Sequence, residues 1–341
     1  MTNREFFAAN KFGMMCHWGL YSMLGGEWKG KIVSNYAEWI QAHFAIPNKE
    51  YHNLANAFNP VLFNAEDWIK LAKECGMTYF VFTAKHHDGF AMFHSKVDKF
   101  NIVDATPYKK DIVASLAEAC YKYGLKFGLY YSQELDWAHP HGGGYTNSDP
   151  SDGVTWENSW DFPEKEKKDF SICFEEKIKP QVQELLTNYG DIYLSWFDTP
   201  HTITSAQSLE LNQLVKKYQP NSLINSRIGN GDYDYVSLND NEIPSEAAPE
   251  GLLEKTGDMN TLSGYKYSPY GLYETPATIN HSWGIKFSDQ AWRTSAELLE
   301  LKRHLNSKGV NYLLNIGPDA QGRIPAKSEE VLRGMIELER K

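Results

Sequence analysis

Apolar strand-like segments and amphipathic helix-like segments alternate along almost the whole of this 341-residue chain. Residues 64–76 are typical of a helix, because their apolar side chains recur near the helical period and Gly76 ends the pattern. The apolar run at 79–83 that follows is typical of a buried strand. Repeated alternation of this kind predicts a parallel sheet that is covered by helices.

The expected strands are residues 11–18, 79–83, 125–131, 191–197, 221–225, 233–238, 278–279 and 310–316. The expected helices are residues 64–76, 111–124, 168–190, 205–218, 295–309 and 326–341. Strands in this number over this length fit a (β/α)8-like TIM barrel better than an open doubly wound sheet. No G-x-G-x-x-G follows the first strand, which argues further against a dinucleotide-binding sheet. We therefore expect an α/β fold of the TIM-barrel type.

Charge and cysteine content exclude several classes of partner. The net charge is -10 and no block of five basic residues occurs, which argues against nucleic acid and anionic membrane. No run of 18 apolar residues predicts a membrane span, and residues 1–5 lack the apolar stretch of a signal peptide. Cys75 and Cys120 fall within helical patterns and are expected to be buried thiols. These features predict a cytoplasmic protein.

Polar and ionisable side chains follow nearly every expected strand. In a barrel, the residues just past each strand converge on one mouth. They are His17, Trp18, Lys85, His86, His87, Asp88, Tyr130, Tyr131, Ser132, Trp196, Phe197, Asp198, Ser226, Arg227, Asn239, Asp240, Asn241, Glu242, Tyr273, Glu274 and Asn315. Long Gly- and Pro-containing segments at 139–161 and 242–273 also leave strand ends. This regularity predicts an active site at the mouth.

Three kinds of site are compatible with the histidines of this set. A metal site could draw on His17, His86, His87 and Asp198, although no H-x-H or H-E-x-x-H spacing occurs. Neighbouring strand residues also point to opposite faces, so His86 and His87 would not easily share one ion. The alternatives are an acid/base pair and a set of hydrogen-bonding groups for a polar ligand.

The carboxylates indicate a more specific chemistry. Asp198 comes directly after a buried strand, where an acid costs desolvation unless it is paired or used. Asp240, Glu242 and Glu274 are candidates for a second carboxylate across the mouth. Glycoside hydrolysis requires two carboxylates that flank the scissile bond. Aromatic residues make up 14% of the chain, and their faces suit sugar rings.

The chain resembles the retaining α-L-fucosidases. The matching segments are KFGMMCHWGLYS, YAEW, TAKHHDGF, LYYSQELDW, LSWFDTP, INSRIGNG, YETPATINHSWG and LLNIGPDAQGRIP, from residue 11 to residue 325. The resemblance implies a (β/α)8-like barrel. Family members often add a C-terminal β-sandwich, whereas here we expect a single catalytic domain over residues 1–341 without it. In this respect the chain is similar to the compact α-1,6-L-fucosidases of lactobacilli, which act on core fucose linked to N-acetylglucosamine.

The resemblance also implies roles for individual residues. Asp198 in WFD matches the family nucleophile, and Asp240 in D-N-x-I-P matches the acid/base of the α-1,6 enzymes. Glu242 is the alternative acid/base, and Glu274 in YET is a third candidate or a substrate-binding residue. The other implied fucose-binding residues are His17, Glu38, Trp39, His86, His87, Tyr131, Arg227 and Trp283.

The implied reaction is a double displacement that retains the anomeric configuration. The two carboxyl groups should then lie about 5–5.5 Å apart. No cofactor and no metal are required, and a sugar hydroxyl that intercepts the intermediate would give transfucosylation. The expected partner is a fucosylated oligosaccharide or glycan, and an exposed barrel surface favours a homo-oligomer. A metal-dependent TIM-barrel hydrolase and a non-catalytic fucose-binding barrel are the alternative functions.

Overall fold

The centre of the molecule is one eight-stranded sheet in which all neighbouring strands are parallel. The computed structural model describes residues 1–143, 158–244 and 268–341. The strands run in the order β7-β6-β5-β4-β1-β10-β9-β8. They are β1 (Phe12–Cys16), β4 (Tyr79–Lys85), β5 (Lys126–Ser132), β6 (Leu194–Asp198), β7 (Leu223–Ile224), β8 (Val236–Ser237), β9 (Tyr273–Thr278) and β10 (Val310–Ile316).

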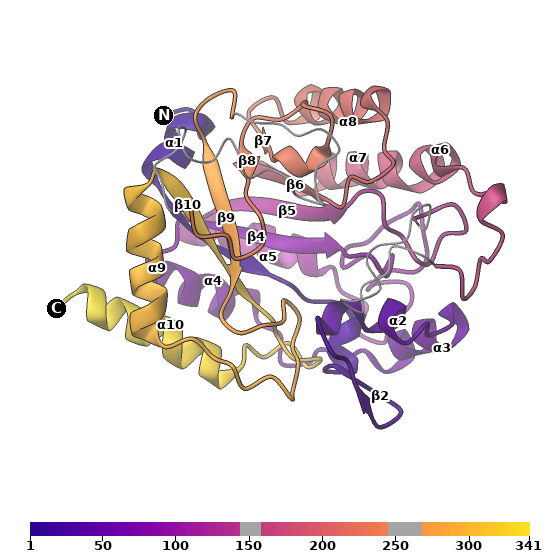
Figure 1. Cartoon of the computed structure of the whole chain (residues 1–341), viewed down its shortest axis with the longest axis horizontal. Helices are drawn as coiled ribbons and strands as arrows, with labels where there is room; N and C mark the ends of the chain where they lie inside the picture. Colours follow the sequence, from indigo (N-terminus) through magenta and orange to yellow (C-terminus); the bar gives the residue numbers. More distant parts are fainter. Residues whose placement is uncertain (144–157, 245–267) are drawn as a thin grey trace.

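The two edges of this sheet meet and turn it into a barrel. The sheet curls so that β7 and β8 lie beside each other (Figure 1). A parallel bridge between Asn225 and Tyr235 joins the residue after β7 to the residue before β8. The predicted (β/α)8-like barrel is therefore confirmed.

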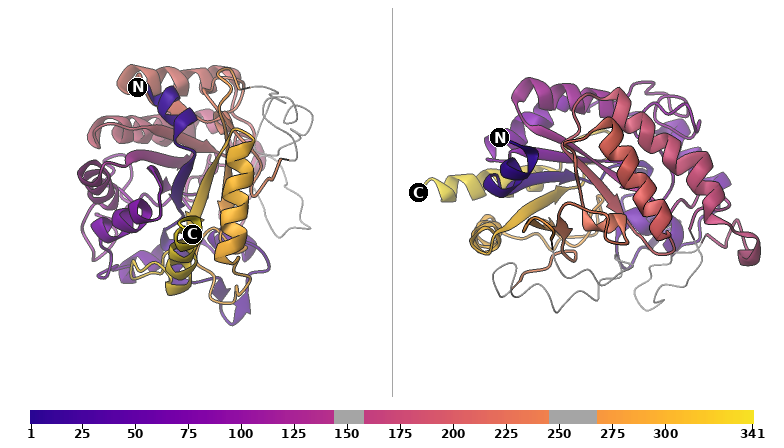
Figure 2. Two further views of the ribbon diagram at one scale, coloured as in Figure 1. Left: turned by 90° about the vertical axis from the view of Figure 1, so that its left-hand side faces the viewer. Right: turned by 90° about the horizontal axis from the view of Figure 1, so that it is seen from above.

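Helices cover the outside of the barrel (Figure 2). The long ones are α4 (Ala65–Glu74), α5 (Ile112–Tyr123), α7 (Lys179–Asn188), α8 (Ser205–Tyr218), α9 (Ser295–Ser307) and α10 (Ala326–Glu339). Their ends follow local rules: α5 begins where the Asp111 side chain accepts from the Ala114 N–H, and ends at Gly124, whose φ of 76° suits glycine. The short α1 (Asn3–Ala9) places Phe7 against Tyr235 and Tyr79, which point into the barrel.

Strand residues alternate between two apolar layers. Phe80 and Phe82 of β4 belong to the layer between sheet and helices, whereas Tyr79 and Val81 pack inside the barrel. This period of two follows from the pleat of the strand. It determines which side chain of each strand end faces the mouth.

Most expected elements are present, and two differ. Strand β9 begins at Tyr273, not at residue 278 as expected. The expected helix at 168–190 consists of α6 (Phe170–Cys173), a π-helical turn η6 (Phe174–Ile178) and α7. All four cysteines are free and buried, as expected for two of them. Within the three described ranges, no helix is both long and apolar enough to cross a membrane. The greater part of each expected loop, 139–161 and 242–273, lies outside the described ranges.

Candidate active site

Asp198 is the last residue of β6 and lies at the mouth of the barrel. Asp198 is 8% exposed. One carboxylate oxygen, Oδ2, accepts from the Tyr130 hydroxyl at 2.7 Å, and Oδ1 accepts from Arg227 Nη1 at 3.2 Å. These two donors, one of them a cation, fix the orientation of the carboxylate, which a nucleophile requires.

Arg227 joins the two carboxylates. It lies in the turn η7 (Ser226–Ile228), which follows β7, and its Nη2 donates to Asp240 Oδ1 at 2.7 Å. The guanidinium carbon stands 4.8 Å from the ring centroid of Trp196. The side chain of Asp240 is 31% exposed, against 11% for Asp198. One acid is therefore enclosed and the other open to solvent, with a single cation between them.

Two histidines of the mouth have a defined tautomer. His17 Nδ1 lies 2.8 Å from Asn315 Oδ1, and the Asn315 amide nitrogen donates to the Trp283 carbonyl at 2.7 Å. His87 Nδ1 lies 2.7 Å from Ser132 Oγ, which itself donates to the Leu135 carbonyl at 2.8 Å. Because both neighbours accept, each imidazole carries its proton on Nδ1. Nε2 of each ring is then an acceptor, which suits a hydroxyl group.

These histidines are neutral. Burial lowers the pKa of His17 to about 4, although its bond to Asn315 opposes the shift. Burial also lowers the pKa of His86 and His87 well below the usual value. His86 Nδ1 is buried and has no hydrogen-bond partner within the described ranges. Neutral imidazoles with unused nitrogen atoms are suited to binding an uncharged polar ligand.

Aromatic rings pack against the three histidines of the mouth. Trp283 packs on His17 with ring centroids 5.0 Å apart, and Trp39 packs on His87 at 4.6 Å. Tyr130 is stacked parallel to His86 at 5.7 Å. The site therefore combines flat apolar surfaces with hydrogen-bonding nitrogens, a combination that suits a sugar with an apolar substituent.

Glu38 is a further acid of the site, and it is buried like Asp198. Its Oε2 accepts from the Gly284 N–H at 2.8 Å and from the Ser282 hydroxyl at 3.2 Å. Its Oε1 is buried and has no hydrogen-bond partner in the described part of the chain. Burial raises the pKa of Glu38 to about 7, against the lowering effect of the Gly284 bond. Glu38 thus presents one unused oxygen.

The turn at residues 83–90 holds His86 and His87 in place. Asp88 accepts from the Phe90 N–H at 3.1 Å and from the Tyr51 hydroxyl at 2.9 Å, so this acid stabilises the turn. Gly89 has a φ of 78°, and a Cβ here would lie 2.3 Å from Asp136 Oδ1. Glycine is therefore required at this position.

Two predicted site residues, Tyr131 and Glu274, lie elsewhere than expected. Tyr131 is not at the mouth: its ring faces the helix layer, and its hydroxyl donates to Gln181 of α7 at 2.8 Å. Its neighbour Tyr130 occupies the mouth instead. The sequence places both tyrosines at the strand end, and the family resemblance assigned only Tyr131 to the substrate. The period of two along β5 indicates that one of the pair faces inward, without indicating which. The geometry therefore favours Tyr130 over Tyr131 as the tyrosine that lines the site.

Glu274 lies below the mouth, near the start of β9 and not after the strand end. It is fully buried, and accepts from Trp196 Nε1 at 3.0 Å and from the Tyr79 hydroxyl at 2.9 Å. Burial raises its pKa to about 7. Its hydrogen bond to Trp196 connects Glu274 to the mouth.

Glu242 stabilises its own loop. Its Oε2 accepts from the backbone N–H and the side-chain amide of Asn239, at 3.0 and 2.9 Å. Asp240, by contrast, is held by Arg227 beside Asp198. Of the three acid/base candidates, Asp240, Glu242 and Glu274, the geometry favours Asp240.

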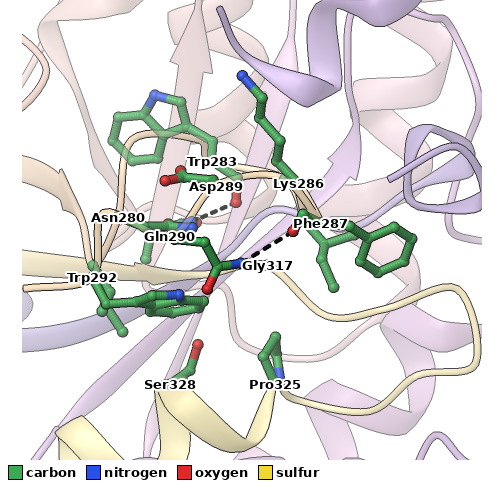
Figure 3. A pocket seen from close by; sticks show the side chains of 14 residues that line it. Asn280, Trp283, Lys286, Phe287, Asp289, Gln290, Trp292, Gly317, Pro325 and Ser328 are labelled. Atoms are coloured by element: carbon green, nitrogen blue, oxygen red, sulfur yellow. Dashed lines mark hydrogen bonds between the residues drawn. The ribbon is translucent and has the colours of Figure 1, made fainter. Parts of the chain in front are cut away.

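The loop that carries Trp283 lines a cavity of about 180 Å³ (Figure 3). Asn315, which orients His17, also lines this cavity. Gln290 closes one side, where its side chain donates to the Phe287 carbonyl at 3.2 Å. No group of three side chains suited to hold a metal ion occurs within the described ranges.

The profile of the alpha-L-fucosidase family matches residues 1–338. The chain belongs to this family.

Solved structures and curated relatives of the family are similar to this chain. Alpha-L-fucosidase AlfC from Lactobacillus casei is 54% identical, with a TM-score of 0.91 over 99% of this chain and 98% of that one. The alpha-L-fucosidase of Vibrio sp. strain EJY3 is 34% identical, with a TM-score of 0.87 over 99% of this chain and 55% of the other. Human plasma alpha-L-fucosidase is 28% identical over 96% of this chain, which spans only 66% of the human protein.

Proposed function

We propose that this chain is a retaining exo-α-L-fucosidase that releases terminal α-L-fucose. The observation that carries the proposal is the pair Asp198 and Asp240 on one guanidinium, beside neutral imidazoles and aromatic rings. Family membership supports the activity. In this proposal, residues 1–341 form one catalytic barrel. A cytoplasmic location and association between protomers stay predictions.

The proposed reaction has two steps. Asp198 attacks the anomeric carbon while Asp240 protonates the departing oxygen, and Asp240 then activates the water that releases fucose. Tyr130 and Arg227 hold Asp198 in the attacking position. In this proposal neither step uses a cofactor.

The proposed fucose site is formed by His17, Glu38, Trp39, His86, His87, Tyr130, Arg227 and Trp283. Acceptor nitrogens on His17 and His87 would bind sugar hydroxyls, and the unused oxygen of Glu38 would bind another. Trp39 and Trp283 offer the apolar contact that the methyl group of this 6-deoxy sugar needs.

For the linkage, we propose α-1,6-linked fucose on N-acetylglucosamine. AlfC, the 54%-identical protein, has been solved in complex with Fucα(1,6)GlcNAc. AlfC has also been solved as fucosyltransferase mutants, which supports transfucosylation as a second outcome of the same intermediate. A panel of α-1,2, α-1,3, α-1,4 and α-1,6 disaccharides tests the linkage: fastest release from the α-1,6 substrate is expected, and preference for another linkage would contradict it.

The experiment that tests the proposed function is hydrolysis of p-nitrophenyl α-L-fucoside. The wild-type chain should turn it over, and Asp198→Ala should lose at least about a thousandfold in kcat because the nucleophile is gone. Azide should rescue this variant and give a fucosyl azide of inverted configuration. Asp191→Ala, an exposed acid just before the same strand, is the matched control. Near wild-type turnover by Asp198→Ala would contradict the assignment.

A further inference from the structure

The last residue of β5, Ser132, and the two residues after it contact three other parts of the site. Ser132 Oγ holds His87 at 2.7 Å. The side-chain amide of Gln133 donates to the Arg227 carbonyl at 2.9 Å. Glu134 reaches the loop that follows Asp198. Consecutive residues of one segment therefore fix a histidine, the shared arginine and the loop of the nucleophile.

Glu134 is the most unusual of these residues. It is 1% exposed, and its carboxylate accepts from the backbone N–H groups of His201, Thr202 and Ile203 at 2.6 to 3.0 Å. The Thr202 hydroxyl adds a fourth donor at 2.6 Å. Burial raises the pKa of Glu134, and these donors oppose the rise. Glu134 therefore holds one loop by accepting from three successive backbone amides, and we call this contact with residues 201–203 the clamp.

The clamped loop begins in an unfavourable backbone conformation. Thr199, directly after Asp198, has a φ of 57°. This left-handed conformation is rare for a β-branched residue and persists only where its surroundings enforce it. Thr199 is buried, and its hydroxyl donates to the Asp198 carbonyl at 2.8 Å. The direction in which the chain leaves Asp198 thus depends on contacts made by the loop beyond it.

We propose that Glu134 is a positioning residue for the nucleophile: by binding residues 201–203, it holds the turn at Thr199 and thereby aims the Asp198 carboxylate. The inference rests on the proposed function. A neutral amide would not replace the carboxylate, because its NH2 group would face N–H donors. The sugar-binding histidines come from other strands, so loss of the clamp should affect nucleophilic attack more than fucose binding.

The test compares Glu134→Gln with wild type on p-nitrophenyl α-L-fucoside. The concentration of working sites is counted with a covalent 2-fluorofucoside inactivator, so that partial unfolding is not mistaken for slow chemistry. We expect kcat per site to fall about tenfold or more, because small misplacements of a reacting group have large effects. The inhibition constant of free fucose should change less than about twofold. Glu118→Gln, on the exposed face of α5, is the matched control.

Thr202→Val keeps the test decisive if Glu134→Gln does not fold. It removes one donor from a partly exposed residue, and should lower kcat several-fold with fucose inhibition unchanged. Thr187→Val, at an exposed threonine of α7, is its control. Unchanged kcat per site in the folded variants, or an equal loss of fucose binding, would overturn the positioning role. Absence of wild-type turnover would instead contradict the proposed function.

Discussion

Tyr130 and Tyr131 are adjacent in the sequence and have opposite surroundings. The Tyr130 hydroxyl donates to Asp198 inside the barrel, and the Tyr131 hydroxyl donates to Gln181 among the helices. The sequence motif could not decide between them, because both tyrosines precede the same strand end. The decision depends on the register of the strand, which the packing of the two apolar layers determines.

The two tyrosines therefore form a matched pair of variants. Tyr130→Phe should lower kcat on an aryl fucoside about tenfold or more, because Asp198 loses a charge-assisted bond. Tyr131→Phe should leave kcat close to wild type and lower the free energy of unfolding by about 1–3 kcal/mol, because Gln181 loses its buried donor. Steady-state kinetics and urea unfolding measure the two effects. The reverse result would show that Tyr131 faces the substrate.

Because the Glu274 carboxyl is buried, we expect the stability of the protein to depend on pH. Burial raises its pKa from 4.5 to about 7 in the folded state. The folded protein therefore keeps a proton that the unfolded chain releases near pH 4.5, and the free energy of unfolding falls as pH rises from 4.5 to about 7. This carboxyl accounts for about 3 kcal/mol of that fall.

Glu274→Gln should remove this part of the pH dependence. Urea unfolding at about pH 5 and about pH 8 should show a smaller loss of stability in the variant than in wild type. Glu300→Gln, on α9, serves as the control because Glu300 is exposed. An equal loss in wild type and Glu274→Gln would mean that Glu274 ionises in the folded protein as freely as in the unfolded chain.

At the scale of elements, the π-helical turn η6 is the feature that sequence periodicity did not predict. Its residue Lys177 points inward and lies 2.9 Å from Asp136 and 2.7 Å from Asp98. Lys85 of β4 also contacts Asp136 at 2.9 Å. A regular helix period places apolar residues inward, so a lysine at this position gives no signal until its buried partners are known. The ion pairs of Lys177 and Lys85 with Asp136 therefore connect η6 to β4, the strand before the turn that carries His86.

The variant Lys177→Met tests this cluster. It should lower the free energy of unfolding by about 3–5 kcal/mol, because Asp136 keeps its burial and loses one of two cations. Lys179→Met is the matched control on the next helix: its partners Glu175 and Glu210 are largely exposed, so a loss of about 1 kcal/mol or less is expected. Chemical denaturation measures both. Similar losses in the two variants would contradict the special role of the buried cluster.

Strand β9 shows why an element boundary was missed. Its sequence, YETPAT, contains a glutamate and a proline, which are rare in central strands. On one side of β9, strand β8 pairs only with the first two residues, Tyr273 and Glu274. Further along the same side, the Pro276 carbonyl accepts from the N–H of Asn241, which lies in a loop. Proline is tolerated here because that edge needs no strand donor. Glu274 is tolerated because its hydrogen-bond partners lie inside the barrel.

At the scale of the whole molecule, the barrel was predictable because each strand and helix carries its own periodic signal. The convergence of Asp198, Arg227, His17 and His86 on one mouth was also predictable, since the ends of parallel strands meet there. The pairing of Asp198 with Asp240 through one guanidinium was not, because it depends on the path of the loop after β8. Glu134 escaped prediction for the same reason, because its partners are loop amides.

We also expect the activity of the whole protein to be independent of bound metal ions. The imidazoles of the mouth are directed at neighbouring side chains and, in our proposal, at sugar hydroxyls. Turnover of the aryl fucoside should therefore be unchanged after treatment with a chelator. Loss of activity that returns on addition of a divalent ion would favour the metal-dependent hydrolase instead.

The most direct test of the account is to trap the intermediate. An activated 2-fluorofucoside should accumulate as a fucosyl ester because departure of the sugar is slowed, and peptide mass spectrometry locates the label. We predict that the labelled peptide carries Asp198 and that the product first released from a natural substrate is α-L-fucose. A label on Asp240, or release of the inverted anomer, would contradict the double displacement on Asp198.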